Sequence, residues 1–214
     1  MKQIRKIAGC LAAVLCLSAC GSASAAAEPA APKEPAAEAA ETPAAEAPQS
    51  ETEQPAEEKT LVVYFSATGT TKGIAEIIAA VTGADTYEIK AAKEYTDADL
   101  DWHDSSSRTT NEQNDSSVRP EIASEPVSLD GVTRIFIGYP IWWGEEPRIM
   151  DTFVEANDFT GITMIPFCTS GSSGIGHSGK NLAENAGTGD WLDGQRFGAG
   201  ASEDEIRSWI EGLN

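Results

Sequence analysis

Cysteine and histidine are scarce in this sequence of 214 residues. It has four cysteines, and Cys10, Cys16 and Cys20 all lie within the first 20 positions. Only Cys168 follows, so an intramolecular disulfide between unmodified thiols is excluded beyond residue 20. We expect Cys168 to be a small buried residue at the end of a strand; a redox-active thiol is the alternative. The two histidines are too dispersed for a metal-binding pattern and the carboxylates lack calcium-loop spacing, so no metal site is expected.

Basic residues are also few. The chain has 15 Lys and Arg against 34 Asp and Glu, a net charge of -19 and a sequence pI of about 4.3. Residues 60–214 alone carry a net charge of -15. This acidity argues against nucleic acid as a partner and against direct adsorption to an anionic membrane, because both would be repelled. It favours basic partners, or it serves only the solubility of the surface.

No apolar run is long enough to span a bilayer as a permanent helix, which takes about 20 residues. The run from Ile7 to Leu17 follows a basic start and is too short, which is typical of a signal peptide. It ends in Leu17-Ser18-Ala19-Cys20, which resembles the bacterial lipoprotein box, where cleavage before the cysteine leaves it N-terminal and lipid-modified. We therefore predict a lipoprotein signal peptide at 1–19 and lipidation of Cys20. An ordinary secretory signal cleaved a few residues later is the alternative.

The stretch after this signal lacks apolar periodicity. Residues 21–59 are almost entirely Ala, Pro and Glu, with a net charge of about -7. Repeated prolines block a continuous helix, and so little apolar surface cannot offset the entropy of ordering the chain. We expect 20–59, lipidated cysteine included, to be a disordered tether. The protein would then be exported and anchored by its lipid at the outer face of the cytoplasmic membrane or in the cell envelope, with 60–214 as one domain.

Residues 60–214 alternate strand-like and helix-like segments. Short β-branched runs without polar interruption predict strands buried on both faces, and apolar residues at helical spacing predict helices between them. This alternation indicates an α/β fold with a parallel sheet covered on both sides. The predicted strands are Thr60–Ser66, Asp85–Lys90, Arg134–Tyr139, Ile162–Cys168 and Asp190–Phe197. The predicted helices are Thr70–Thr82, Arg148–Asn157, Lys180–Ala186 and Glu203–Leu213.

The loop after the first strand is rich in hydroxyl groups. Ligands of such sheets bind at the carboxyl ends of the strands, and Ser66-Ala67-Thr68-Gly69-Thr70-Thr71 lies where the amides of a helix start are unsatisfied. These amides and hydroxyls favour a phosphate held without an arginine clamp. The loop is neither a Walker sequence nor a dinucleotide fingerprint. A simple hydroxyl cap of the helix is the alternative.

The order of strand, Ser-Ala-Thr-Gly-Thr-Thr and helix is similar to the FMN-phosphate loop of flavodoxins, and every defining position matches. The resemblance extends over nearly all of 60–214. It implies a flavodoxin-like three-layer αβα sandwich, with a doubly wound five-stranded parallel sheet in the order 2-1-3-4-5. It also implies FMN, bound non-covalently, as the cofactor, with its phosphate held by Ser66, Ala67, Thr68, Gly69, Thr70 and Thr71.

Two adjacent tryptophans follow the next core strand, in Pro140-Ile141-Trp142-Trp143-Gly144. Neighbouring side chains cannot both point into one core, and a flat apolar ligand would explain an exposed indole. The resemblance implies that Pro140, Ile141, Trp142, Trp143 and Gly144 line the flavin ring. It further implies that the Gly144 peptide, which reorients cheaply, responds to the redox state of the flavin. The alternative places one tryptophan in the core and the other as a cap on the next helix.

A Gly- and Ser-rich loop, 169–178, follows the third core strand. Its composition permits close approach of backbone amides to a ligand, whereas a flexible linker is the alternative. By resemblance, Thr169, Ser170 and Gly171 contact the pyrimidine side of the flavin. His177 is either a donor to the flavin or to a substrate, or a simple loop residue.

The segment 91–131 is longer than a minimal connection and departs from the family pattern. We expect it to form a helix flanked by a mobile loop. It either covers the site or contacts a partner.

Together these patterns predict an FMN-binding electron-transfer protein that acts on redox partner proteins or small-molecule acceptors. The alternative is an FMN-dependent NAD(P)H:quinone, flavin or azo reductase of the same fold, although no nicotinamide-nucleotide fingerprint is visible. A binding module that has lost its flavin is disfavoured by the intact phosphate loop. Because the flavin performs the redox chemistry, no catalytic side chain is assigned.

Overall fold

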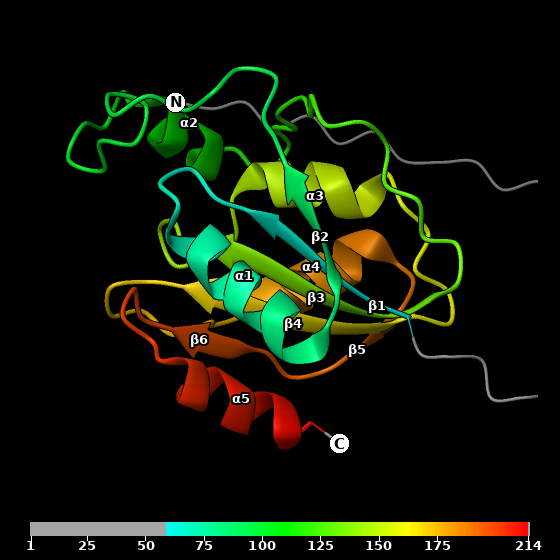
Figure 1. The fold of residues 1–214 in the computed structure, drawn as a ribbon. Coiled ribbons are helices and arrows are strands. Elements are labelled where there is room, and N and C mark those ends of the chain that lie inside the picture. The colour runs from blue at the N-terminus through cyan, green and yellow to red at the C-terminus, as the bar shows by residue number, and fades with distance from the viewer. Residues whose placement is uncertain (1–58, 214) are drawn as a thin grey trace, which may run out of the picture. The chain divides into compact units, whose positions relative to one another are not determined.

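A computed structural model describes residues 59–213, and its elements alternate as the sequence predicts (Figure 1). The predicted signal peptide, Cys20 and almost all of the predicted tether lie outside the described residues. The strands are β1 (Lys59–Phe65), β2 (Asp85–Ile89), β3 (Val132–Pro140), β4 (Thr163–Thr169), β5 (Asp190–Trp191) and β6 (Gln195–Phe197). The helices are α1 (Thr70–Thr82), α2 (Arg108–Asn114), α3 (Arg148–Glu155), α4 (Ser178–Ala186) and α5 (Glu203–Glu211).

The sheet is parallel throughout and has the order β2-β1-β3-β4-β5, with β6 also paired to β4. The predicted order 2-1-3-4-5 is confirmed. The expected fifth strand, Asp190–Phe197, is instead split into β5 and β6. The carbonyls of Ile162 and Met164 accept hydrogen bonds from the strand at this edge, so alternate residues of β4 face it. Pro166 comes next in that alternation and has no N–H to donate, which explains the break.

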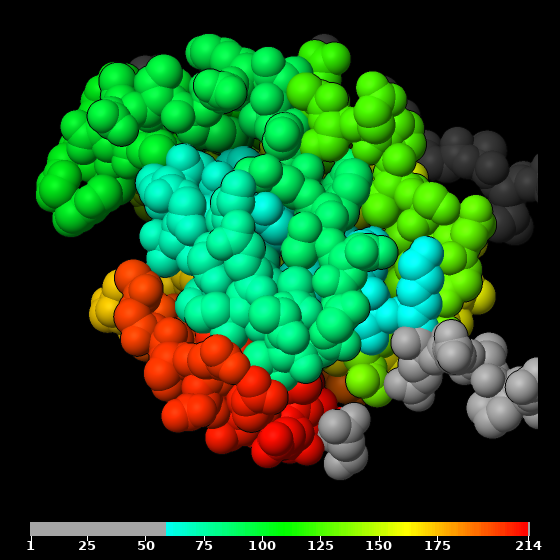
Figure 2. All heavy atoms as spheres, viewed as in Figure 1, coloured from blue at the N-terminus to red at the C-terminus, as the bar shows by residue number. Residues whose placement is uncertain are grey.

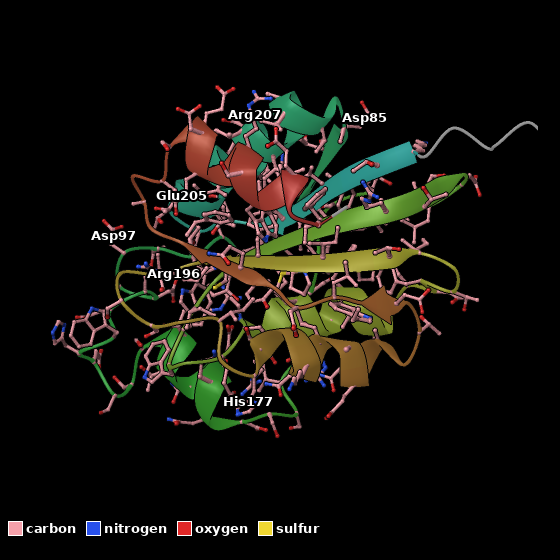
Figure 3. The ribbon with its side chains drawn as sticks, turned by 90° about the horizontal axis from the view of Figure 1, so that it is seen from below. Asp85, Asp97, His177, Arg196, Glu205 and Arg207 are labelled. Atoms are coloured by element: carbon pink, nitrogen blue, oxygen red, sulfur yellow. The ribbon has the colours of Figure 1, made fainter. Side chains whose placement is uncertain are left out.

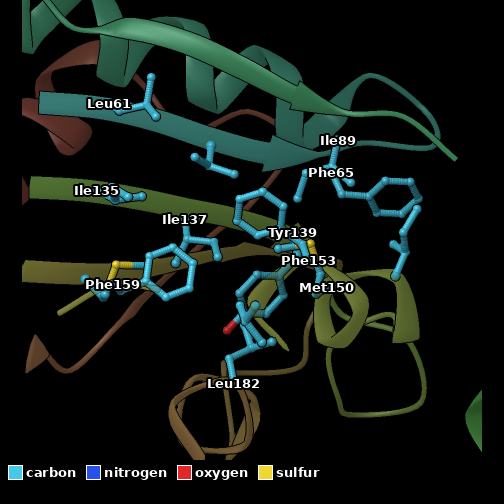
Figure 4. Packing of buried hydrophobic residues seen from close by; sticks show 14 of the residues in the cluster. Leu61, Phe65, Ile89, Ile135, Ile137, Tyr139, Met150, Phe153, Phe159 and Leu182 are labelled. Carbon is cyan, nitrogen blue, oxygen red and sulfur yellow. The ribbon is translucent and has the colours of Figure 1, made fainter. Parts of the chain in front are cut away.

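The helices cover both faces of the sheet, α1 and α5 on one and α3 and α4 on the other, as Figure 3 shows. The alternation of side chains along β1 divides the core in two. Leu61, Val63 and Phe65 pack toward α3 and α4 (Figure 4), whereas Val62 and Tyr64 pack toward α1 and α5. All five side chains are buried. This is the predicted three-layer αβα sandwich.

No helix among residues 59–213 is long and apolar enough to cross a bilayer. Within the same residues, no three His, Cys, Asp or Glu side chains are grouped so as to hold a metal ion. The lone Cys168 is buried at the end of β4, and burial raises the pKa of its thiol to about 12. The thiol is therefore a core group, as expected, and not an activated one.

Candidate functional site

The hydroxyl-rich loop leaves the start of α1 without a side-chain cap. Gly69 is the N-cap residue and adopts φ 86°, a conformation that favours glycine. The hydroxyls of Thr68 and Thr70 lie 3.4 Å apart beside the free helix end. The simple hydroxyl cap considered from the sequence is therefore wrong. The arrangement instead leaves the first amides of α1 and two hydroxyls available to an anion.

The loop after β3, Pro140 to Gly144, contains the two adjacent tryptophans and is here the tryptophan loop; it forms a tight turn. The amide of Trp142 donates to the Glu145 carbonyl at 2.9 Å, and the amide of Glu145 donates back at 3.0 Å. Trp143 and Gly144 occupy the middle with φ of 50° and 88°, as in a type I′ turn. Trp143 is the one non-glycine residue with positive φ within 59–213. A bulky residue held in this conformation stores strain of about 1–2 kcal/mol, which marks the turn as a candidate for function.

The two indoles point in different directions, as expected for adjacent residues. Trp142 packs edge-on against Phe65 and Tyr95, with ring centroids 5.7 and 5.2 Å away. Trp143 keeps 45 % of its surface exposed. The alternative reading was thus right that one tryptophan joins the core. It was wrong about the other, because the N-cap position of α3 belongs to Pro147.

Polar side chains from α2 and α3 form hydrogen bonds with the tryptophan loop and the residues that follow it. The side-chain amide of Gln113 donates to the carbonyls of Trp142 and Glu146, at 2.9 and 3.1 Å. The buried Arg148 guanidinium donates to the Gln113 carbonyl at 3.2 Å and to the Glu145 carboxylate at 2.8 Å. The helix expected within 91–131 is therefore present as α2, and it supports this loop.

Glu146 is a buried acid directly after the turn. Burial raises its pKa to about 7, and the nearby Asp151 carboxylate adds to the rise. The hydrogen bond from Asn181 and the Arg148 guanidinium, 3.9 Å away, act in the opposite direction. Glu146 is therefore partly protonated near neutral pH.

The third loop, residues 169–178, is hydrogen-bonded to the phosphate loop and to the tryptophan loop. Thr169 is buried, and its hydroxyl lies 2.8 Å from that of Thr71 at the start of α1. Its carbonyl accepts a hydrogen bond from Ile141 of the tryptophan loop at 2.9 Å. The Ser170 hydroxyl donates within the loop, to the Ser173 carbonyl. The ends of β1, β3 and β4 thus form one connected structure.

Arg196 of β6 fixes the outer part of the third loop. Its guanidinium donates to the carbonyls of Ser170 and Gly171, at 2.6 and 2.9 Å, and to the Ser170 hydroxyl at 3.1 Å. In Figure 3, Arg196 lies at the end of the molecule where the carboxyl ends of the strands meet. A single planar group therefore orders a glycine- and serine-rich segment.

Two adjoining cavities open between the loops. The first cavity, about 440 Å³, draws on all three predicted loops and on the turn after β6; it is lined by Thr68, Thr70, Pro140, Ile141, Thr169, Ser170, Gly171, Gly198 and Ala199. The second cavity, about 350 Å³, lies on the other side of Thr68 and Ile141; it is lined by these two and by Leu100, Trp102, Thr109, Trp142 and Trp143. Figure 2 shows a recess at the left of the molecule between the green segment near residue 100 and the orange turn after β6.

Some predicted site residues lie outside both cavities. Ser66 and Ala67 line a separate hollow at the ends of β1 and β2, where the Ser66 hydroxyl is buried without a hydrogen-bond partner. Gly69 is the N-cap residue of α1, and the Thr71 hydroxyl contacts that of Thr169. Gly144 occupies the second central position of the turn in the tryptophan loop. His177 is exposed at the start of α4 and lines neither cavity.

Sequence reasoning missed several residues of the site. Gly198 and Ala199 follow β6, and Arg196 lies within it, where nothing in the local pattern distinguishes them. Leu100, Trp102 and Thr109 come from the segment 91–131, which was expected to cover the site or to contact a partner. No periodicity in that polar stretch singles these three out.

Known proteins provide an independent comparison. The family model described as flavodoxin matches residues 59–213. The crystal structure of a candidate flavoprotein from Bacteroides uniformis is 48 % identical, covers 72 % of this chain and 98 % of its own, and has a TM-score of 0.69. One from Bacteroides eggerthii is 43 % identical, with coverage of 72 % and 97 % and a TM-score of 0.68.

A more distant structure shows the same fold. It is a flavoprotein in complex with FMN from Lactobacillus acidophilus, 23 % identical over 72 % of this chain and 99 % of its own, with a TM-score of 0.55. No curated protein sequence matches the chain. The family model matches all the described residues, and the Bacteroides structures are more than 40 % identical to the chain. Both findings agree with the sheet order described above. The chain belongs to the flavodoxin family.

Proposed function

We propose that residues 59–213 bind FMN in the first cavity and use it to transfer electrons. The observation that carries the proposal is the convergence of three loops, from the ends of β1, β3 and β4, on one cavity of about 440 Å³. That volume lies within the range of small-molecule sites, and the cavity lies at the carboxyl edge of a doubly wound sheet.

The donor set fits a phosphate. The hydroxyls of Thr68 and Thr70 adjoin the uncapped start of α1, and no basic side chain lines the first cavity. A phosphate there would be held by hydrogen bonds and by the helix dipole. The Thr71–Thr169 hydrogen bond orients the loop that carries these hydroxyls.

The remainder of the first cavity fits a flat ring system. Pro140 and Ile141 give it an apolar lining, and the backbone of Thr169 to Gly171 lies beside them. Apart from Gly171 and its two neighbours in the chain, no heavy atom lies within 4 Å of the Cβ position of Gly171, so a ligand can approach the chain closely there. Arg196 holds this backbone in place and so lowers the ordering that binding requires.

The bound flavin supplies the redox chemistry, and the chain sets its environment. Residues 60–214 carry a net charge of -15, which disfavours a reduction step that leaves the flavin anionic more than a step in which a proton accompanies the electron. For a one-electron step, about 59 mV corresponds to about 1.4 kcal/mol, so modest repulsion is enough to separate the potentials of the two one-electron steps.

Titration of the purified full chain with FMN, followed by the quenching of flavin fluorescence, tests the proposal. We expect one FMN per chain with a Kd below 1 μM. Potentiometric titration of the loaded protein should give two separate one-electron steps. Absence of FMN binding would contradict the whole proposal, and a single two-electron wave would contradict the one-electron carrier.

A reductase of the same fold is the second candidate, and one observation favours it. Stacking of both indoles on the ring would block hydride transfer, but Trp142 packs against Phe65 and Tyr95, and neither indole lines the first cavity. Steady-state assays with NADH or NADPH and menadione, a flavin or an azo dye distinguish the candidates. Turnover well above that of free FMN would identify a reductase.

The N-terminal sequence supports a location outside the cytoplasm for this chemistry. The Leu17-Ser18-Ala19-Cys20 motif would anchor the protein through lipid on Cys20, with residues 21–59 as the spacer. Metabolic labelling with a palmitate analogue tests this. Label that is present in the wild-type protein and absent from Cys20→Ala supports the anchor.

A further inference from the structure

A third hollow, of about 320 Å³, is lined by side chains of α3 and α4 and of the residues just before α3. Every residue of its lining is polar or charged, so we call it the polar hollow. Within residues 59–213 it shares no lining residue with the first or the second cavity. It is therefore separate from the site proposed for FMN.

The polar hollow carries more negative than positive charge. Its carboxylates belong to Glu145, Glu146, Asp151 and Glu184. Its cations are Arg119 and Arg148, and Arg119 is already paired with Glu155 at 2.6 Å. Among the described residues around this hollow, Arg148 is thus the one cation left for four carboxylates. Its closest carboxylate contact, at 2.8 Å, is with Glu145.

Two of these acids, Glu146 and Asp151, are buried, each with 1 % of its surface exposed. Asparagines one turn apart on α4 bind one oxygen of each acid. Asn181 donates to Glu146 Oε2 at 3.2 Å. Asn185 donates to Asp151 Oδ1 at 2.9 Å. The two acids are therefore fixed in position before any ligand binds.

The second oxygen of Asp151 is left without a hydrogen bond. Oδ2 is buried and has no hydrogen-bond partner within residues 59–213. The Arg148 Nη1 atom lies 3.5 Å from it, which is longer than a normal hydrogen bond. A buried carboxylate oxygen without a donor is costly, because the water that would solvate it has been removed. The polar hollow therefore offers an unfilled acceptor to a ligand.

A primary ammonium group matches this acceptor. It has three N–H donors and a positive charge, and it can bind carboxylate oxygens as well as the amide oxygens of Asn181 and Asn185. An anion would be repelled by the excess of carboxylates. Within residues 59–213, no three His, Cys, Asp or Glu side chains are grouped so as to hold a metal ion. Because the acids are already desolvated and oriented, an ammonium gains their attraction without that cost.

The protonation of Glu146 competes with such a cation. Because burial raises the pKa of Glu146 to about 7, a proton offsets part of the negative charge of the polar hollow near neutral pH. An added positive charge favours the carboxylate form and so releases this proton. The charged or titratable groups that face Glu146 or line the hollow with it are Arg148 and Asp151 of α3, Glu184 of α4, Glu145, Arg119, and Tyr139 of β3, whose pKa burial raises.

We propose that the polar hollow binds the primary ammonium group of a small amine or of a lysine side chain. Asp151 is its main partner, and the ammonium takes the place of the proton on Glu146. The inference does not use the position of the flavin, so it stands or falls separately from the proposed function.

Titration of the purified full chain with ethylamine at pH 8, followed by NMR of the side-chain amides of Asn181 and Asn185, tests the proposal. We expect saturable shifts with a Kd in the millimolar range, since so small a ligand makes few contacts. Tetramethylammonium has the same charge but no N–H donor, and it should bind at least tenfold more weakly. A lysine blocked at both backbone ends distinguishes the sources: tighter binding than ethylamine assigns the site to a lysine of a partner protein, and weaker binding assigns it to a free amine.

Asp151→Asn should raise the Kd for ethylamine at least tenfold. Glu211→Gln is the matched control, because it removes one negative charge from an exposed position on α5, which covers the other face of the sheet, and should leave the Kd unchanged. Circular dichroism checks that both variants are folded.

The pH dependence tests the exchange with the proton and needs no Asp151 variant. Lowering the pH from 8 to 6 should raise the Kd of the wild type about tenfold, because Glu146 is then mostly protonated. In Glu146→Gln this change should be much smaller.

The contrary outcomes are distinct. Absence of saturable shifts with ethylamine overturns the inference, and so does equally tight binding of tetramethylammonium, which would show charge attraction alone. An equal loss of affinity in Asp151→Asn and Glu211→Gln has the same meaning. A Kd that does not change between pH 6 and pH 8 overturns the exchange with the proton. FMN binding, measured on the same samples, reports on the proposed function independently.

Discussion

The side-chain hydroxyls of Thr71 and Thr169 lie 2.8 Å apart in the interior and join the start of α1 to the end of β4. Thr71→Val should lower the free energy of unfolding by about 1–2 kcal/mol, because it leaves the Thr169 hydroxyl buried without a partner. The double variant with Thr169→Val should lose less than the sum of the two single variants, since no orphan remains. Urea denaturation of the full chain measures both.

Thr82→Val is the control for that cycle. The Thr82 hydroxyl donates to the Ile78 carbonyl of its own helix, at 2.7 Å, so its loss strands no distant partner. Strictly additive losses at Thr71 and Thr169 would show that the contact between them does not stabilise the loops.

The strain at Trp143 predicts an inverted order of stability for two small substitutions. Glycine is normally less stable than alanine by about 0.5–1 kcal/mol. At φ 50° the alanine Cβ is disfavoured, so Trp143→Gly should be more stable than Trp143→Ala by about 1 kcal/mol. Both variants remove the same indole, so the difference in their urea midpoints isolates the backbone term. The normal order would mean that the turn relaxes to negative φ in solution.

The sequence predicts the fold well where local pattern and tertiary role agree. The uninterrupted strand Thr60–Ser66 and the periodic helix Thr70–Thr82 appear as β1 and α1 with almost the same bounds. The phosphate loop between them is placed by those two elements. Its position at the sheet edge therefore follows from the sequence.

Other features depend on pairings that no local pattern encodes. The role of Arg196 requires β6 to pair with β4, which brings the guanidinium to Ser170 from 26 positions away. Trp142 packs inward and Trp143 stays exposed because of a turn in which Trp143 and Gly144 both have positive φ. Only the glycine indicates positive φ from the sequence. The split of the last strand depends on Pro166 in its neighbour. These features follow from contacts between residues that are distant in the sequence, so local patterns do not predict them.

The raised pKa of the buried Glu146 carboxyl predicts that the free energy of unfolding falls as the pH rises. Its pKa is about 7 in the folded protein and about 4.5 when unfolded, so between these values the folded state binds more protons. Stability therefore falls from about pH 4.5 to pH 7, and the loss is complete above pH 7. Glu146→Gln cannot ionise, so its unfolding free energy relative to wild type should increase by about 2–3 kcal/mol between pH 5 and pH 8.

Glu184→Gln, at an exposed acid lining the same polar hollow beside α4, is the control. A pH dependence that appears in Glu146→Gln and exceeds that of Glu184→Gln assigns the effect to the buried carboxyl rather than to the net charge of the hollow. If Glu146→Gln also showed no change with pH, the carboxyl would be ionised at all these pH values in the folded protein.

Arg196 predicts a defect in ligand binding without a comparable loss of fold. Its three hydrogen bonds, at 2.6, 2.9 and 3.1 Å, all go to Ser170 and Gly171. Lysine keeps the charge but cannot form this planar fork. In Arg196→Lys the loop must be ordered when the ligand binds, so the affinity for FMN should fall about tenfold, or about 1.4 kcal/mol.

Hydrogen exchange tests the cause as well as the effect. Peptides that span Ser170 and Gly171 should exchange faster in FMN-free Arg196→Lys than in the FMN-free wild type, and FMN should restore much of the protection. Arg207→Lys alters an exposed ion pair with Glu203 on α5, outside the third loop, and should change neither exchange nor affinity. An unchanged affinity in Arg196→Lys, together with faster exchange, would show that the third loop does not take part in holding FMN.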